Sequence, residues 1–188
     1  MNKQLILVKH SLPEIVENIP AREWHLSQEG RARADRLAEK LMAYEPEVLI
    51  SSDEPKAIET AEILSRKLQL PHSVFENLHE HERSKAGYLT RNEFENAVRE
   101  FFAKPDALAF GGETANQAHE RFSTAIFSVL HTYPEKTIIL VSHGTVVSLW
   151  VSRLIGTSPF ELWKELGLPS FVVLDMDANT IVEKENII

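Results

Sequence analysis

Two apolar runs of nearly identical sequence constrain this chain most, and a histidine follows each of them. The first is QLILVKHS at residues 4–11, and the second is TIILVSHG at residues 137–144. A short, almost continuous run of Leu, Ile and Val is typical of a strand covered on both faces, as the parallel strands of an α/β sheet are. Because ligands of open α/β sheets bind at the carboxyl ends of the strands, His10 and His143 are predicted to share one site.

The rest of the chain alternates between helix and strand patterns. Apolar residues at helical spacing predict helices at residues 28–44, 55–68, 90–102, 114–131 and 146–154, with a short helix after Ser158. Further strands are predicted at residues 48–50 and 71–75, and a terminal hairpin at residues 171–176 and 180–185. The predicted fold class is α/β: a three-layer α/β/α sandwich with a mostly parallel central sheet and a C-terminal antiparallel hairpin.

Local signals mark where three of these helices begin. Thr90 and Thr114 each stand three residues before a Glu or Gln, which is the capping-box pattern. Asp53 is predicted to cap the helix that carries Pro55 and Lys56 in its first turn. That helix follows a strand directly, so Lys56 is expected at the sheet edge where the two histidines lie.

Length and composition fit one globular domain. The chain has 188 residues, of which 43% are apolar, and this suffices for one hydrophobic core. We therefore expect a single domain over residues 1–188. The helices between the third strand and the His143 strand are expected to make residues from about 77 to 131 a helical lid or side lobe.

The composition argues against several classes of function. The formal net charge of -8 disfavours nucleic-acid binding, although a local field can still attract a small anion. The absence of cysteine excludes disulfides, thiolate catalysis and thiolate metal sites. No apolar run approaches the ~20 residues of a membrane span, and residues 5–8 are too few for a signal-peptide core. We expect a cytoplasmic protein that binds neither nucleic acid nor membranes.

Six short motifs follow one another along the chain. They are Lys9-His10-Ser11, WHLSQEG at residues 24–30, SSDEPKAIETA at residues 51–61, Leu78-His79-Glu80, Gly112-Glu113-Thr114 and Ser142-His143-Gly144. In this order they resemble the histidine phosphatase superfamily, the phosphoglycerate mutase-like fold, whose motifs are Arg-His-Gly, Trp-x-Leu-Thr/Ser-x-x-Gly, Ser-Ser-x-x-x-Arg-Ala-x-x-Thr-Ala, Leu-x-Glu, Gly-Glu-Ser/Thr and Ser-His-Gly. Each motif is short, but six in order make a specific resemblance that spans residues 5–144.

The resemblance implies a phosphatase that works through a phosphohistidine on His10, without metal or cofactor, on a small phosphorylated substrate or inorganic phosphate. A neutral imidazole can attack phosphorus through one nitrogen when the other donates to a backbone carbonyl. Positive groups must then surround the equatorial oxygens, and Lys9, Lys56 and His143 are the candidates. Glu80 is the candidate general acid, since a nearby phosphate dianion raises the pKa of a carboxyl group.

Three positions depart from the family motifs. Lys9 and Lys56 stand where the family has arginine, and lysine offers a point charge in place of a planar fork of donors. Each change is expected to cost about 1 to 3 kcal/mol of transition-state stabilisation, the spread typical of charged hydrogen bonds. Ser11 replaces glycine and adds a side chain, as a further donor or an obstruction, where phosphate would approach.

Weaker candidates for substrate contact surround this core set. They are Ser11, Arg22, Trp24, Arg83 and Gly144. Trp24 is also suited to packing its loop against the first helix. Arg83 can contact a second anionic group of the substrate or form a surface ion pair.

Four functions remain open at this stage. The first is a phosphomonoester hydrolase, and the second is a weakened relative that binds a phosphorylated metabolite or partner. The third is a metal hydrolase in which His10, His143 and Glu80 are the ligands. A mutase that returns the phosphoryl group is a further alternative, disfavoured by the short chain. Neither the substrate nor the oligomeric state is indicated.

Overall fold

The computed structural model describes residues 4–83 and 89–188, which contain one six-stranded sheet in the order β3-β2-β4-β1-β5-β6. The strands are β1 (Gln4–Lys9), β2 (Val48–Ser51), β3 (His72–Val74), β4 (Ile138–Ser142), β5 (Ser170–Asp175) and β6 (Thr180–Asn186). The first four pair parallel with one another, whereas β5 pairs antiparallel with β1 and β6 antiparallel with β5. The predicted fold class, including the C-terminal hairpin, is confirmed.

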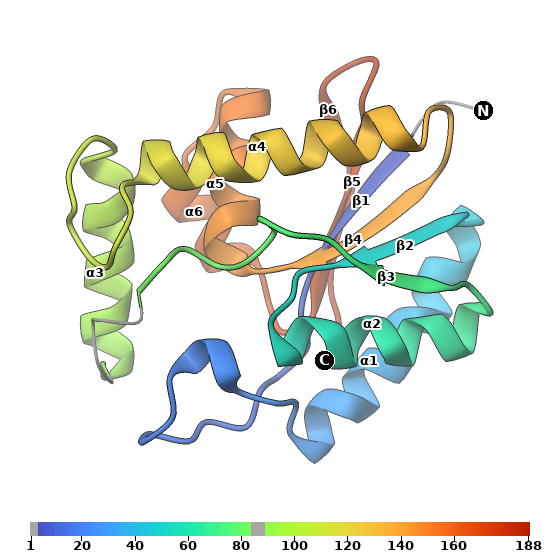
Figure 1. Cartoon of the computed structure of the whole chain (residues 1–188), viewed down its shortest axis with the longest axis horizontal. Coiled ribbons are helices and arrows are strands. Elements are labelled where there is room, and N and C mark those ends of the chain that lie inside the picture. Colours follow the sequence, from blue (N-terminus) through green and yellow to red (C-terminus); the bar gives the residue numbers. More distant parts are fainter. Residues whose placement is uncertain (1–3, 84–88) are drawn as a thin grey trace.

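Helices cover both faces of this sheet. They are α1 (Gln28–Leu41), α2 (Pro55–Leu68), α3 (Arg91–Ala103), α4 (Ala115–Thr132), α5 (Gly144–Ile155) and α6 (Pro159–Glu165). Figure 1 shows α1 and α2 on one side of the sheet and α4 and α5 on the other, with α3 farther out, where it packs against α6. In the described part of the chain, none of these helices has the length and apolar content that crossing a bilayer requires.

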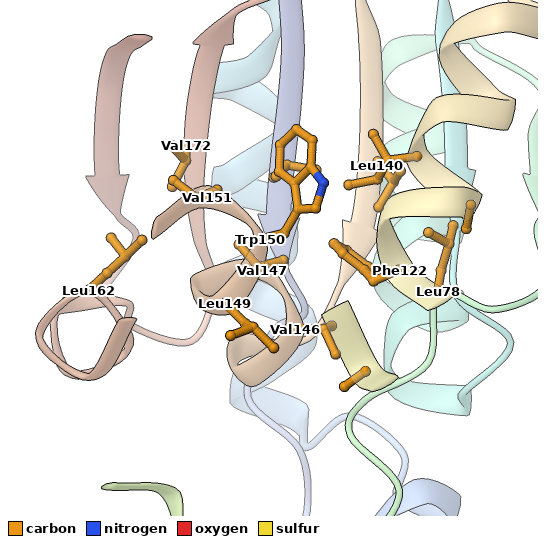
Figure 2. Packing of buried hydrophobic residues seen from close by; sticks show 14 of the residues in the cluster. Leu78, Phe122, Leu140, Val146, Val147, Leu149, Trp150, Val151, Leu162 and Val172 are labelled. Atoms are coloured by element: carbon orange, nitrogen blue, oxygen red, sulfur yellow. The ribbon is translucent and has the colours of Figure 1, made fainter. Parts of the chain in front are cut away.

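The strands are continuously apolar because both of their faces are buried. Side chains of a strand alternate between the two faces of the sheet. Accordingly Leu5 and Leu7 join the core under α4 and α5, while Ile6 and Val8 join the core under α1 and α2, and none of the four is exposed. Figure 2 shows the first of these cores, in which Trp150 of α5 lies among the aliphatic side chains on the sheet.

The structure confirms two predicted helix starts and corrects two others. Thr90 and Thr114 each form both hydrogen bonds of a capping box. The prediction that Asp53 caps α2 is wrong: Glu54 occupies the cap position with no side-chain cap bond, because α2 begins only at Pro55. Helix α5 begins at Gly144, directly after His143, rather than at residue 146.

Strand register brings the ends of β1 and β4 together. Lys9 pairs with Ser142, so the next residues along the two strands are His10 and His143. The backbone N–H of His10 donates to the Ser142 carbonyl at 2.9 Å, and that of Ser52, which follows β2, donates to the Val141 carbonyl at 2.9 Å. Three neighbouring strands therefore end at one edge of the sheet.

Candidate active site

The two imidazoles predicted to share a site lie against each other at this edge. The ring centroids of His10 and His143 are 5.1 Å apart, and the ring planes are inclined by 61°. His10 is 7% exposed and His143 is fully buried. The two rings are therefore in edge-to-face contact inside the protein.

The orientation of His10 is fixed by its own backbone. Nδ1 lies 2.7 Å from the carbonyl oxygen of Ser11. A carbonyl only accepts hydrogen bonds, so Nδ1 carries the proton and Nε2 keeps its lone pair. Burial lowers the pKa of His10 well below its usual value, and His143 and Lys56 lower it further. His10 is thus a neutral imidazole with Nε2 unprotonated.

His143 presents a buried donor. Its Nε2 lies 2.8 Å from the hydroxyl of Ser52, and that hydroxyl accepts the backbone N–H of Glu54 at 3.3 Å. The Ser52 hydroxyl can therefore donate to Nε2, and in that tautomer the imidazole proton lies on Nδ1. This Nδ1 is buried and has no hydrogen-bond partner among the described residues. Burial, and next Lys56, lower the pKa of His143 well below its usual value.

Lys56 is buried beside a carboxylate that the sequence analysis did not select. Its ammonium group donates to the carbonyl of Ala21 at 2.7 Å and forms an ion pair with Glu54. Lys56 is 3% exposed and Glu54 is 4% exposed. Burial lowers the pKa of Lys56, and the charge of Glu54 opposes that shift. The acidic residue two positions before Lys56 was visible in the sequence, but its inward direction depends on where α2 begins.

Lys9 reaches the same region from β1 and passes Gly144. A Cβ atom at position 144 would lie 3.0 Å from Cε of Lys9, so a larger residue there would require the end of the Lys9 side chain to shift by a few tenths of an ångström. The Lys9 ammonium donates to the carbonyl of Leu166 at 2.7 Å. Burial lowers the pKa of Lys9 to about 8, although the charge of Glu80 acts in the opposite direction.

Glu80 is held at the start of α5 by three backbone N–H groups. Its carboxylate accepts from His81 at 2.9 Å, from Thr145 at 3.2 Å and from Val146 at 3.3 Å. Burial raises the pKa of Glu80, but Arg83, His143 and the His81 N–H lower it, and the net shift is downward. Glu80 is therefore an anion stabilised by a helix N-terminus.

Arg83 lies near Glu80 and His143, since its charge lowers the pKa of both. Its guanidinium stacks over the ring of Phe94, with Cζ 4.5 Å from the ring centroid. Nη1 is buried and has no hydrogen-bond partner among the residues described. From the sequence, Arg83 was only a weaker candidate, because no local pattern in residues 77–89 indicates this stacking. Residues 84–88 of that segment lie outside the described residues.

The remaining substrate candidates brace the loop over the site. The Ser11 hydroxyl donates to the carbonyl of Gly30 at 2.6 Å, and its backbone N–H donates to the Thr60 hydroxyl at 3.0 Å. Trp24 donates from its indole to the carbonyls of residues 16 and 19, at 3.1 and 2.9 Å. Arg22 is exposed on the short 3-10 helix Ala21–Glu23. In this conformation Ser11 and Trp24 hold the loop in place.

The described residues offer no ready metal centre. Within residues 4–83 and 89–188, no group of three or more His, Asp or Glu side chains is arranged to hold a metal ion. The interpretation of His10, His143 and Glu80 as a ligand set therefore gains no support from their geometry.

Comparison with known proteins assigns this sheet, with its two buried histidines at one edge, to a family. The sequence model of the histidine phosphatase superfamily (branch 1) matches residues 5–186, and the chain belongs to this superfamily. Among curated proteins it is similar to the uncharacterized phosphatase PhoE of Bacillus subtilis, with 22% identity over 134 residues. That match covers 71% of this chain and 66% of the relative, so the chain spans just under two thirds of its length.

Solved structures share the fold at low sequence identity. The phosphoserine phosphatase of Entamoeba histolytica, in complex with 3-phosphoglyceric acid, is 17% identical, with a TM-score of 0.80 over 98% of this chain and 97% of that one. A mycobacterial glucosyl-3-phosphoglycerate phosphatase is 20% identical, with a TM-score of 0.74 over 92% and 90% of the two chains.

The depressed histidine pKa values predict how stability depends on pH. Below pH ~6.5 both histidines are protonated in the unfolded chain but not in the folded protein. The free energy of unfolding therefore decreases as the pH is lowered, by up to about 1.4 kcal/mol per pH unit for each histidine. Both pKa values are lowered mainly by burial. Urea denaturation at pH 7.5, 6 and 5 measures the slope. A His10→Asn variant should lose stability less steeply, and an unchanged slope in that variant would contradict the assignment.

Proposed function

We propose that this protein is a metal-independent phosphomonoester hydrolase that acts through a phosphohistidine on His10. The observation that carries the proposal is the orientation of His10. Its Nδ1 donates to the Ser11 carbonyl at 2.7 Å, and its ring centroid lies 5.1 Å from that of His143. Membership of the histidine phosphatase superfamily supports the reaction class. The chain would act as one domain, in which Glu80 and Arg83 of the 77–131 segment complete the site from one side.

The proposed reaction has two steps. Nε2 of His10 attacks phosphorus, the bond from phosphorus to the ester oxygen breaks, and the departing alkoxide takes a proton from Glu80. Water then attacks the phosphohistidine and returns a proton to Glu80, which releases inorganic phosphate and neutral His10. Glu80 gains its proton only when a phosphate dianion nearby raises its pKa, against the downward shift that Arg83, His143 and the His81 N–H cause.

Three groups are proposed to contact the phosphoryl oxygens, beside the attacking nitrogen of His10. They are Lys9, Lys56 and the Nδ1 of His143. The resemblance of the motifs puts family arginines at both lysine positions, so a planar guanidinium would be absent there. Arg83 is proposed as a further substrate contact, since its buried Nη1 lacks a partner among the described residues.

The role of Glu80 as proton donor can be tested by comparing esters whose leaving groups differ in their need for a proton. Replacing Glu80 with glutamine is expected to lower kcat/KM, which reports the steps up to release of the alcohol, by about 10² to 10⁴-fold on an alkyl phosphate, the range for general acid catalysis. The loss should be much smaller for 4-nitrophenyl phosphate, whose phenolate leaves without a proton. Steady-state kinetics on both esters, with thermal melting to confirm folding, make the comparison. An equal loss on both would remove Glu80 from the role of acid.

A second candidate function is binding of a phosphorylated metabolite or partner with little turnover. One observation favours it: protein acceptors already hold both ammonium groups, Lys9 by the Leu166 carbonyl and Lys56 by the Ala21 carbonyl and Glu54. In that case calorimetry detects a phosphate ester that the protein does not hydrolyse, and arginine at positions 9 and 56 raises a near-zero rate. Rapid turnover by the unmodified protein would eliminate this candidate.

The substrate is proposed to be a small phosphate ester. Solved structures with the same fold include a phosphoserine phosphatase with 3-phosphoglyceric acid and a glucosyl-3-phosphoglycerate phosphatase with inorganic phosphate. A panel of sugar, glycerate, amino-acid and nucleotide phosphates, assayed with the protein and its His10→Ala variant, tests the class. Hydrolysis that survives the variant comes from a contaminant or from another mechanism.

A further inference from the structure

A buried carboxylate lies among the groups proposed to bind phosphate. Glu54 is 4% exposed, and each of its oxygens is engaged inside the protein. One forms the ion pair with Lys56, and the other accepts the backbone N–H of Glu80 at 2.8 Å. The second oxygen also lies 3.6 Å from Nε2 of His143. Glu54 therefore contacts three residues of the proposed site at once.

This position changes the charge that a ligand meets. An anion that binds beside His143 must share the Lys56 ammonium with a carboxylate that already holds it. Charges of like sign interact strongly where water is excluded, because the effective dielectric constant is low. A phosphate dianion is therefore repelled by Glu54 while it is attracted by the lysines and Arg83.

The transition state of phosphoryl transfer suffers less from such repulsion. In a loose transition state the phosphoryl group resembles metaphosphate, and part of the charge of the dianion has moved to the leaving oxygen. A negative group beside the phosphoryl oxygens thus disfavours the bound ground state more than the transition state. Only interactions that differ between the two states change kcat.

We propose that Glu54 is a specificity-determining residue. Its carboxylate pairs with the Lys56 ammonium and so weakens binding of the phosphate dianion, both as substrate and as product. This inference rests on the proposed function, because it concerns the same phosphate site. It predicts that removing the charge of Glu54 tightens phosphate binding. A residue that only positioned Lys56 and the Glu80 backbone would have the opposite effect, since its loss would disorder the site.

The test is titration of the intact protein with inorganic phosphate by calorimetry. Glu54→Gln keeps the size of the side chain and an acceptor for the Glu80 N–H, and we expect it to lower the Kd for phosphate by about tenfold, as loss of one nearby like charge does. Glu54→Asp keeps the charge and should not tighten binding. Glu62→Gln removes the same charge from an exposed position on α2 and controls for net charge.

A kinetic readout separates the inference from a structural role. Glu54→Gln should lower KM, and the inhibition constant of phosphate, by a larger factor than it changes kcat. If it lowers the stability of the protein, the rise in melting temperature with added phosphate still reports affinity, because each variant is compared with its own unliganded form. Phosphate binding that is unchanged or weaker in Glu54→Gln would overturn the inference.

These measurements distinguish a failure of the inference about Glu54 from a failure of the proposed hydrolase function. If phosphate esters are hydrolysed through His10 but Glu54→Gln binds phosphate no more tightly, the inference fails and the proposed function stands. If Glu54→Gln binds phosphate more tightly but neither protein hydrolyses any ester, the inference stands and the hydrolase proposal fails.

Discussion

Replacing His10 with alanine is expected to reduce phosphate-ester hydrolysis by about 10⁴-fold or more, the scale on which enzymes lose activity with a covalent nucleophile. The reason is geometric. His10 has Nδ1 committed to the Ser11 carbonyl, whereas His143 has Nε2 committed to the Ser52 hydroxyl. No described side chain is arranged to replace the lone pair of His10. Steady-state assays on 4-nitrophenyl phosphate measure the loss.

Two controls make the His10 result specific. His25→Ala removes an exposed imidazole that pairs with Glu59, and it should leave the rate within about twofold, since surface substitutions have small effects. Rapid acid-free quenching during turnover should trap an acid-labile phosphoryl group on the unmodified protein and none on His10→Ala. A folded His10→Ala variant that keeps a tenth of the activity would end the phosphohistidine mechanism.

The sequence was sufficient to predict the fold and the two histidines because one physical pattern specifies both. Strands buried on both faces have no polar residue within their apolar run, so β1 and β4 were recognisable as strands before their neighbours in the sheet were known. Parallel pairing then required their carboxyl ends to meet, which brings His10 beside His143. The capping boxes at Thr90 and Thr114 were predictable because their hydrogen bonds lie within four residues of sequence.

The electrostatics of the site could not be predicted in the same way. The ammonium groups of Lys9 and Lys56 are held by carbonyls that lie 157 and 35 residues away in the sequence. The direction of Glu54 depends on the turn that precedes Pro55, where the sequence favoured Asp53 as the cap. Such contacts form only once distant loops are in place, so the residue types alone predicted the cations but not the groups that hold them.

The buried pair of Lys56 and Glu54 makes the largest prediction for stability. Replacing Lys56 with methionine is expected to lower the free energy of unfolding by about 3 to 5 kcal/mol, the cost of leaving one charge of a buried pair without its partner. Both side chains are less than 5% exposed, so solvent cannot compensate the Glu54 carboxylate. Urea denaturation at pH 7.5 measures the change.

The double variant decides whether the loss comes from the unpaired charge. Adding Glu54→Gln to Lys56→Met removes the orphaned carboxylate and keeps an acceptor for the Glu80 N–H, so most of the lost stability should return. Lys136→Met breaks the half-exposed pair with Glu47 and should cost far less stability than Lys56→Met, because solvent screens an exposed ion pair. If the double variant is no more stable than Lys56→Met, the unpaired charge of Glu54 is not the cause of the lost stability. Lys56 would then stabilise the fold through its packing and its hydrogen bond to the Ala21 carbonyl.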